Sequence, residues 1–256
     1  MMEIMSRDNA TFKNLLKLCD KKHRRATGLC IIEGEKIVRE HLNTAKQVFV
    51  RSGSRFTEER LNTNADVFVL ADKLFDLVSD LQNGAGVLAT VAIPAARAVT
   101  FPYLVLDGVQ DAGNMGTILR TAAAFGYRTV FCIDCVDVWG QKVLRASSGI
   151  QFGLNIIENN MNDFVVPPGT TLVGADLDGA DISVAGGGIM ESDNNGAAAM
   201  GNFGLVLGSE GQGIRSQIKA MLNQTVTIPM DAGCESLNVA VAGAILMFEL
   251  WGKRKN

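Results

Sequence analysis

The sequence predicts an α/β protein with two domains. Short apolar runs typical of buried strands alternate with helical patterns along all 256 residues. The stretch IPAARAVT at 93–100 separates two alternating halves and is the best candidate for a linker. In the second half, polar Gly-rich turns follow the apolar runs, which is where α/β proteins bind ligands. We expect a first domain at 1–93, a linker at 94–101 and a second domain at 102–256.

The first half begins with a helical pattern at 11–22. Its apolar residues Phe12, Leu15, Leu16 and Cys19 have helical spacing, and lysines occupy the other side. We interpret the following segment KKHRR as a basic turn. Strands are expected at 29–32, 47–50, 67–70 and 86–92, with helices after the first strand, at 54–61 and at 72–79.

The second half repeats the alternation of strands and helices. Its Gly-rich segment at 186–202 has no periodicity and is expected to form a loop. Strands are expected at 103–106, 129–133, 153–157, 171–175, 203–207 and 225–228. Helices are expected at 116–125, 142–147, 212–222 and 237–251.

Composition and cysteine usage predict a soluble cytoplasmic protein. No apolar stretch approaches the roughly 20 residues that a membrane-spanning helix needs, and no signal segment starts the chain. The five cysteines are an odd number and are expected to be reduced thiols. Cys132 and Cys135 form a lone CxxC without a nearby His, so we expect apolar packing and no metal site.

Charge is distributed unevenly along the chain. The formal net charge is −3, but residues 1–60 hold 13 Lys and Arg against 8 Asp and Glu, and the remainder is acidic. The basic segment is therefore the better candidate to attract an anionic polymer such as RNA. A solvated helix face would have the same composition.

Two turns of the second half carry polar residues suited to ligand binding. The turn DAGNMG presents Asn114 near a helix N-terminus, with Arg120 further along that helix, although Arg120 could equally be a surface residue. The turn GSEGQG lacks the GxGxxG spacing, and Glu210 would repel a pyrophosphate. Glu210 is better suited to accept hydrogen bonds from a hydroxyl or an amine, or simply to sit near a helix N-terminus.

A third segment, IPMDAGCESLN, places Ser236 and Asn238 at the start of the last helix. Taken alone, this pair is typical of a helix N-cap. The histidines, His23 and His41, both lie in the first half, so a Ser-His-Asp triad has no base in the second.

Together these segments resemble motifs 1, 2 and 3 of the SpoU/TrmH family, RNA ribose 2′-O-methyltransferases of the SPOUT class. The resemblance covers roughly 103–252, and VLRASSG at 143–149 also looks familial. The first half is similar to the small ribosomal-protein-like substrate domain of many members. Two positions depart from the pattern, Ala112 in place of a frequent Pro and Gly233 one place late. The matching residues are Asn114 and Arg120, then Gly208, Glu210 and Gly213, then 228–230 and 236–238.

The resemblance implies S-adenosylmethionine as cofactor, a trefoil knot in the C-terminal domain, a homodimer and no metal. The implied catalytic residues are Asn114, Arg120, Glu210, Ser236 and Asn238. The implied cofactor contacts are Ala175, Gly208, Gly213, Ile228, Met230 and Leu237.

The implied reaction transfers a methyl group to a ribose 2′-hydroxyl of structured RNA, with 23S rRNA expected and tRNA as the alternative. The family's proposed base is the motif 1 Arg, here Arg120, yet a guanidinium pKa exceeds about 12. Arg120 is therefore either a perturbed base or an anchor for the neighbouring phosphate. RNA phosphates are expected to bind Lys21, Lys22, Arg24 and Arg25. A non-catalytic RNA-binding or ribosome-assembly factor on the same fold is the alternative from another class.

Overall fold

The computed structural model describes residues 1–57, 61–81, 84–185, 190–192, 198–200 and 202–253, and it divides into two compact units. The first unit comprises Met1–Pro94 together with Asp137–Gly149, and the second comprises Ala95–Val136 and Ile150–Asn256. The expected domain limits differ from this division, because residues 137–149 associate with the first unit.

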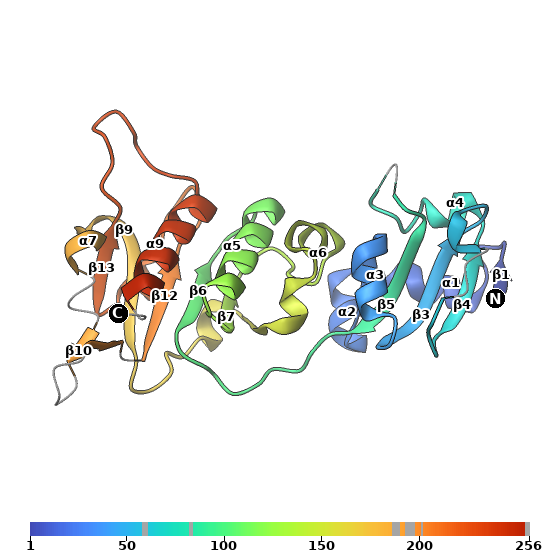
Figure 1. The fold of residues 1–256 in the computed structure, drawn as a ribbon, viewed down its shortest axis with the longest axis horizontal. Helices are drawn as coiled ribbons and strands as arrows, with labels where there is room; N and C mark the ends of the chain where they lie inside the picture. The colour runs from blue at the N-terminus through green and yellow to red at the C-terminus, as the bar shows by residue number, and fades with distance from the viewer. Residues whose placement is uncertain (58–60, 82–83, 186–189, 193–197, 201, 254–256) are drawn as a thin grey trace. The chain divides into compact units, whose positions relative to one another are not determined.

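The first unit contains a mixed five-stranded sheet of order β1-β4-β3-β5-β2 (Figure 1). Strands β1, β3 and β4 run parallel to one another, while β5 is antiparallel to β2 and β3. The strands are β1 (Met2–Ile4), β2 (Leu29–Glu33), β3 (Ala45–Arg51), β4 (Asp66–Leu70) and β5 (Val87–Ala92). The helices are α1 (Ala10–Lys17), α2 (Lys21–Thr27), α3 (Glu35–His41), η1 (Arg55–Thr57), α4 (Asp72–Phe75) and α6 (Gln141–Ser147).

Helix α6 belongs to the first unit because it packs against β2. Gln141 Nε2 donates a hydrogen bond to the Val78 carbonyl oxygen (3.1 Å), and Arg145 pairs with Asp80 at 3.7 Å. The stretch at 143–149 that looks familial therefore lies within this unit.

The basic segment KKHRR is helical, which corrects the expected turn. The helix expected at 11–22 ends with α1, and Asp20 then caps α2 by accepting hydrogen bonds from the backbone N–H groups of Lys22 (2.7 Å) and His23 (3.3 Å). The helix expected at 54–61 is a single short turn, η1, as far as the described residues extend, since 58–60 lie outside them.

The second unit contains a six-stranded, all-parallel sheet of order β13-β9-β12-β6-β7-β8. Its strands are β6 (Tyr103–Asp107), β7 (Thr129–Ile133), β8 (Asn155–Asn159), β9 (Thr171–Asp181), β12 (Phe203–Leu207) and β13 (Gln224–Thr227). Its helices are α5 (Ala112–Ala124), η2 (Ile150–Gly153), η3 (Met161–Asp163), α7 (Ile182–Ala185), α8 (Ser216–Lys219) and α9 (Val239–Lys253).

Helices α5 and α9 lie side by side on the second unit (Figure 1). A Cβ atom on Gly243 of α9 would approach Leu207 Cδ1 to 2.6 Å, so glycine permits α9 to pack tightly on β12. The rings of Phe125, at the end of α5, and Phe248 of α9 meet edge to face at 5.8 Å.

The segment expected as a loop at 186–202 lies partly outside the described residues. Its described portions form two short strands, β10 (Met190–Ser192) and β11 (Ala198–Met200), which pair antiparallel. The loop interpretation therefore holds for neither of these two stretches.

Candidate active site

The site lies at the carboxyl ends of parallel strands in the second unit. Strands β6, β9, β12 and β13 are neighbours in the sheet, so the segments that follow them emerge at one edge. These segments contain the three motifs found in the sequence. The fold thus brings together residues that are far apart in the chain.

Glycines shape the segment after β12 into a tight loop. The backbones of Ser209 and Gly213 exchange hydrogen bonds of 3.0 and 3.1 Å, and Gly213 has a φ of +63°. A Cβ atom on Gly208 would lie 2.1 Å from the Gly213 carbonyl carbon, so only glycine fits there. Glu210 is exposed at the tip of this loop.

A chain of side-chain hydrogen bonds links the three motifs. Asn114 Nδ2 donates to Glu210 Oε1 (2.5 Å), and Asn238 Nδ2 donates to Asn114 Oδ1 (3.0 Å). Asn238 Oδ1 also accepts hydrogen bonds from two backbone N–H groups in the first turn of α9, those of Ala240 (2.9 Å) and Val241 (3.3 Å). Asn238 is therefore both the N-cap of α9 and part of the polar chain.

Asn114 lies in the first turn of α5, which corrects the expected helix start at 116. Asp111 caps the helix by accepting a hydrogen bond from the Asn114 backbone N–H (2.7 Å), so the helix begins at Ala112. The turn DAGNMG expected from the sequence is thus largely helical.

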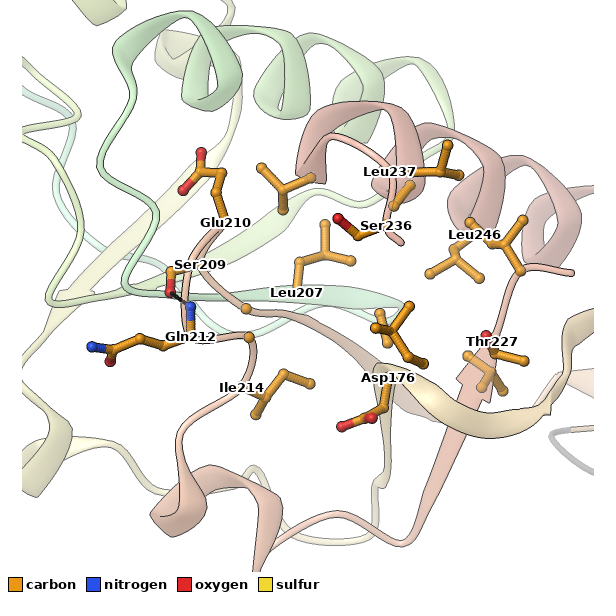
Figure 2. Close-up of a pocket in the computed structure, with 18 of the residues that line it drawn as sticks. Asp176, Leu207, Ser209, Glu210, Gln212, Ile214, Thr227, Ser236, Leu237 and Leu246 are labelled. Carbon is orange, nitrogen blue, oxygen red and sulfur yellow. Dashed lines mark hydrogen bonds between the residues drawn. The ribbon is translucent and has the colours of Figure 1, made fainter. Parts of the chain in front are cut away.

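A cavity of ≈ 490 Å³ opens beside this polar chain (Figure 2). Its walls come from the middle of β9, from the ends of β12 and β13 with the segments that follow them, and from α9. Leu207, Ile214, Val239 and Leu246 provide apolar surface, and Glu210 and Ser236 provide polar atoms. Every residue that the sequence implied as a cofactor contact lines this cavity: Ala175, Gly208, Gly213, Ile228, Met230 and Leu237.

Arg120, which the sequence implied as a catalytic residue, lies away from the other residues of the site. It is exposed, it does not line the cavity, and it is six positions beyond Asn114 on α5. Six helical residues span about 9 Å along the axis and place the two side chains on different faces. Arg120 therefore does not join the Asn114–Glu210–Asn238 chain in this structure.

Sequence reasoning missed an ion pair at the border of the cavity. Lys219 Nζ lies 2.5 Å from Asp176 Oδ2, and both residues line the cavity. The hydrogen bond from Lys219 lowers the pKa of the Asp176 carboxyl. The signal available in the sequence was an Asp directly after Ala175 at a predicted strand end.

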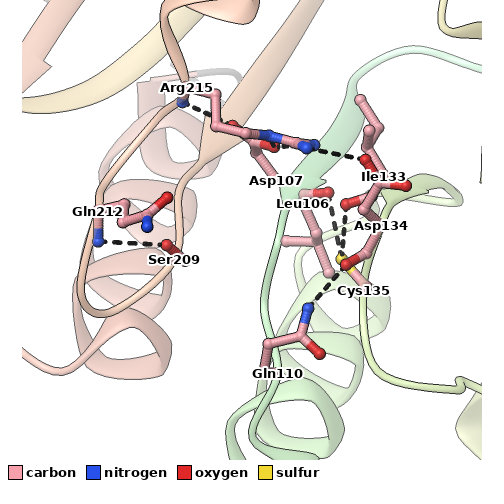
Figure 3. Close-up of polar contacts among 9 residues, drawn as sticks. All are labelled: Leu106, Asp107, Gln110, Ile133, Asp134, Cys135, Ser209, Gln212 and Arg215. Carbon is pink, nitrogen blue, oxygen red and sulfur yellow. Dashed lines mark hydrogen bonds and ion pairs between the residues drawn. The ribbon is translucent and has the colours of Figure 1, made fainter. Parts of the chain in front are cut away.

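Sequence reasoning also missed an arginine that braces the glycine loop (Figure 3). Arg215 donates to Asp107 through its backbone N (2.7 Å) and Nε (2.6 Å), and its Nη1 donates to Asp134 (2.8 Å). Asp107 is only 1% exposed, so Arg215 supplies the charge that neutralises a buried carboxylate. Burial alone would lower the pKa of Arg215, but its bonds to both carboxylates raise it overall.

The same loop borders a second cavity of ≈ 430 Å³. Residues 209–212 line both cavities, and Asp107, Asp134 and Arg215 line the second. Gln110 also lines it and donates to the Asp134 carbonyl oxygen (2.7 Å). The loop that carries Glu210 therefore separates the two cavities.

The four basic residues expected to bind RNA differ in their accessibility. Lys22 and Arg25 are exposed and Lys21 is half-buried. Arg24 is only 6% exposed, and its guanidinium pairs with Asp137 and donates to the Leu18 carbonyl oxygen. The expectation for Arg24 is wrong, because a buried and paired guanidinium is not presented to a phosphate.

Neither a metal centre nor a membrane span is found in the part of the chain that the structure describes. No group of three or more His, Cys, Asp or Glu side chains there could hold a metal ion. None of the described helices combines the length and apolarity needed to cross a bilayer.

Comparison with known proteins finds a matching family for each half of the chain. The model of the SpoU rRNA Methylase family matches residues 102–248, and that of the MRM3-like substrate binding domain matches residues 9–89. The chain is 30% identical to the 23S rRNA (guanosine(2553)-2′-O)-methyltransferase RlmP of Bacillus subtilis, over 98% of this chain and 100% of that protein.

Solved structures agree with these matches. A TrmH-family protein of Porphyromonas gingivalis superposes with a TM-score of 0.78 at 32% identity, over 94% of this chain and 97% of the other. An AdoMet-bound rRNA methyltransferase of Sinorhizobium meliloti has the same fold, with a TM-score of 0.77 at 24% identity over 97% and 96% of the two chains.

Proposed function

We infer the function of this chain from the family to which it belongs, the SpoU rRNA methylase family. We propose that it transfers a methyl group from S-adenosylmethionine to a ribose 2′-hydroxyl of structured RNA, with 23S rRNA as the substrate. The observation that carries the proposal is the hydrogen-bonded chain Glu210–Asn114–Asn238 beside a cavity of ≈ 490 Å³. The family's three motifs meet in this arrangement.

The cavity fits an adenosine cofactor in size and chemistry. Its volume lies within the roughly 300–1,000 Å³ typical of small-molecule sites. Gly208 lines the cavity, and Ile228 and Leu237 offer apolar contacts to a base. When bound, the cofactor supplies a sulfonium-activated methyl group.

The residues of the polar chain would orient the acceptor hydroxyl. A ribose hydroxyl is a poor nucleophile that gives up its proton to water as its oxygen bonds to the methyl group. Its placement against the methyl group therefore matters greatly. Glu210 can accept a hydrogen bond from a hydroxyl, while Asn114 fixes its carboxylate and Asn238 fixes Asn114. Ser236, at the cavity wall, offers a further hydroxyl.

We propose Arg120 as an anchor for an RNA phosphate rather than as a base. A guanidinium stays charged at neutral pH in general and forms bidentate bonds with phosphates. Its exposed position on α5, outside both cavities, suits a contact to the polymer rather than to the cofactor.

We further propose that the protein is a homodimer joined through α5 and α9. Val241 and Phe248, seven residues apart on α9, are 48% and 53% exposed, which leaves an apolar stripe on that helix. Arg120 is exposed on the adjacent helix α5, so the same interface would deliver Arg120 to the partner's site. A C2 dimer would build two such composite sites.

Three further features complete the proposal. The C-terminal part of the chain would form the trefoil knot of the SPOUT class. The two domains would span 1–93 and 102–256, which the matched ranges 9–89 and 102–248 support. The first domain would hold RNA through Lys21, Lys22 and Arg25. The protein would act in the cytoplasm, as expected for a relative of a bacterial rRNA methyltransferase.

Methyl transfer from tritiated S-adenosylmethionine tests the function directly. The purified protein is incubated with 23S rRNA, with 16S rRNA and with tRNA from cells that lack the gene. Label in 23S rRNA at a ribose 2′-oxygen is the expected result. Label in tRNA alone would move the substrate to tRNA, and cofactor binding without transfer to any RNA would favour an assembly factor.

A further inference from the structure

Asp176 and Lys219 form the charged border of the cavity. Asp176 follows Ala175 on β9, and its side chain is 17% exposed. Lys219 ends α8 and is 48% exposed. Both line the cavity, yet neither belongs to the three motifs that carry the family resemblance.

The Asp176 carboxylate has hydrogen-bonding capacity to spare. Oδ2 accepts from Lys219 Nζ at 2.5 Å, and Oδ1 accepts from the Asp178 backbone N–H at 3.3 Å. A carboxylate offers about four acceptor positions, two on each oxygen. These two bonds therefore leave acceptor capacity on the carboxylate for a ligand.

We propose that Asp176 binds the ribose 2′- and 3′-hydroxyls of the adenosine cofactor, and so determines specificity for a ribonucleoside. This inference rests on the proposed function. Two adjacent hydroxyl donors match two acceptor oxygens of one carboxylate. Lys219 holds that carboxylate in place and keeps it ionised.

Charge distinguishes the hydroxyls from another donor of the cofactor, its α-ammonium group. An ammonium group beside Asp176 would lie close to the ammonium of Lys219, and like charges repel. Neutral hydroxyls avoid this repulsion. The sulfonium is also cationic and is better placed near Glu210, whose carboxylate borders the same cavity.

The cavity lining is consistent with this orientation. Figure 2 draws Asp176, Glu210 and Leu246 at separate parts of the lining. An adenosine whose ribose faces Asp176 can direct its sulfonium towards Glu210 and its adenine towards apolar side chains such as Leu237 and Leu246. Each part of the ligand then meets groups of matching chemistry.

Calorimetric titration of the full-length protein tests the assignment with three ligands. They are S-adenosylmethionine, 5′-methylthioadenosine, which lacks the amino-acid part, and 2′-deoxy-5′-methylthioadenosine, which also lacks one hydroxyl. Asp176→Asn and Asp176→Ala are compared with Asp178→Asn, a matched control on the same strand that does not line the cavity. Thermal unfolding verifies that each variant is folded.

We expect both Asp176 variants to bind the two ribonucleosides about 10- to 100-fold more weakly, as for a lost hydrogen bond to a charged group. The deoxy compound should bind the wild type about 10-fold more weakly than its parent, and this penalty should vanish in Asp176→Ala. Asp178→Asn should bind all three ligands as the wild type does.

Two results would overturn the assignment while the proposed function stands. In one, the Asp176 variants lose affinity for S-adenosylmethionine but not for methylthioadenosine, which would assign the carboxylate to the amino-acid part. In the other, the deoxy penalty persists in Asp176→Ala. A wild type that binds no adenosine ligand would instead overturn the proposed function, and this inference with it.

Discussion

The side-chain amide of Asn114 donates a 2.5 Å hydrogen bond to the carboxylate of Glu210, a residue 96 positions later in the chain. Asn114 is fixed by the first turn of α5, whereas Glu210 sits at the tip of a glycine loop. The bond therefore holds the exposed carboxylate of Glu210 in a fixed position relative to α5. Asn238 extends the connection to the N-terminus of α9.

Replacing Asn114 by Ala should impair catalysis more than cofactor binding. The change removes both bonds of the amide, so Glu210 and Asn238 lose their common partner. We expect kcat to fall about 100-fold, the scale of a misplaced reacting group. Cofactor affinity should be nearly unchanged, because Asn114 does not line the cavity. Single-turnover methyl transfer and calorimetry measure the two effects, with exposed Asn162→Ala as control. Equal losses in both would contradict this role.

Arg120→Ala should abolish methyl transfer and leave cofactor affinity nearly unchanged. Arg120 does not line the cavity, so its loss should affect how the RNA is bound and positioned, and not how the cofactor is bound. Arg120→Lys keeps the charge but loses the planar guanidinium fork. A partly active Lys variant with an unchanged pH profile supports the phosphate anchor, whereas a shifted profile supports a base.

Mixing two inactive variants tests whether Arg120 acts on the partner's site. A mixture of Arg120→Ala and Glu210→Ala, unfolded and refolded together, forms mixed dimers in half of the cases. If Arg120 acts across the interface, each mixed dimer has one intact site, and activity returns to about one quarter of the wild type. No recovery would assign Arg120 to its own subunit. Sedimentation showing a monomer at micromolar concentration would exclude the dimer itself.

Arg215→Ala should destabilise the protein by about 3 kcal/mol, because it leaves the buried Asp107 carboxylate without a counter-charge. Chemical denaturation measures the change in unfolding free energy. Adding Asp107→Asn to Arg215→Ala should restore part of that stability, since the uncompensated charge is then removed. A cost below about 1 kcal/mol, the scale of an exposed ion pair, would show that the brace is unimportant.

Strand positions in the second unit could be predicted closely from the sequence. The expected strands at 129–133 and 203–207 coincide with β7 and β12, because a buried parallel strand is a continuous apolar run. Strand β1 was missed, since three residues carry no recognisable period. Helix starts at Ala112 and Lys21 were misplaced because the capping carboxylates of Asp111 and Asp20 were not recognised.

The site was predictable where residues belong to contiguous motifs and not where they meet only through the fold. All implied cofactor contacts line one cavity, since each lies in or shortly after one of three neighbouring strands of the same sheet, β9, β12 and β13. Asp176 and Lys219 join different segments, as do Arg215 and Asp107, and no local pattern marks such pairs. Arg24 was misassigned because composition does not reveal that one residue of a basic cluster is buried.

Cys30 should resist thiol reagents in the native protein, in contrast to Cys234. Cys30 is fully buried, and burial raises the pKa of its thiol to about 12, so roughly one molecule in 10,000 is ionised at pH 8. Cys234 is exposed. Iodoacetamide labelling followed by peptide mass spectrometry should modify Cys234 first, and Cys30 only after denaturant is added. Rapid native labelling of Cys30 would show that β2 opens readily.

Replacing Lys21, Lys22 and Arg25 together by Ala should weaken RNA binding and flatten its salt dependence. These residues share one short helix in the basic segment, and the rest of the chain is acidic and repels RNA. The slope of log K against log salt should fall by about one unit for each RNA phosphate that no longer has a cationic partner. Cofactor binding should not change, because these residues do not line the cavity.

The matched control for this experiment replaces Lys36, Lys46 and Lys73, three exposed lysines of the same unit, by Ala. Both triple variants remove three positive charges, so a purely non-specific attraction would weaken equally in both. A smaller slope only in the α2 variant would assign phosphate binding to that helix. Arg24→Ala should instead lower the unfolding free energy of the protein, because it removes the buried ion pair with Asp137. An unchanged slope in the α2 variant would mean that Lys21, Lys22 and Arg25 form a solvated surface and that RNA is held elsewhere.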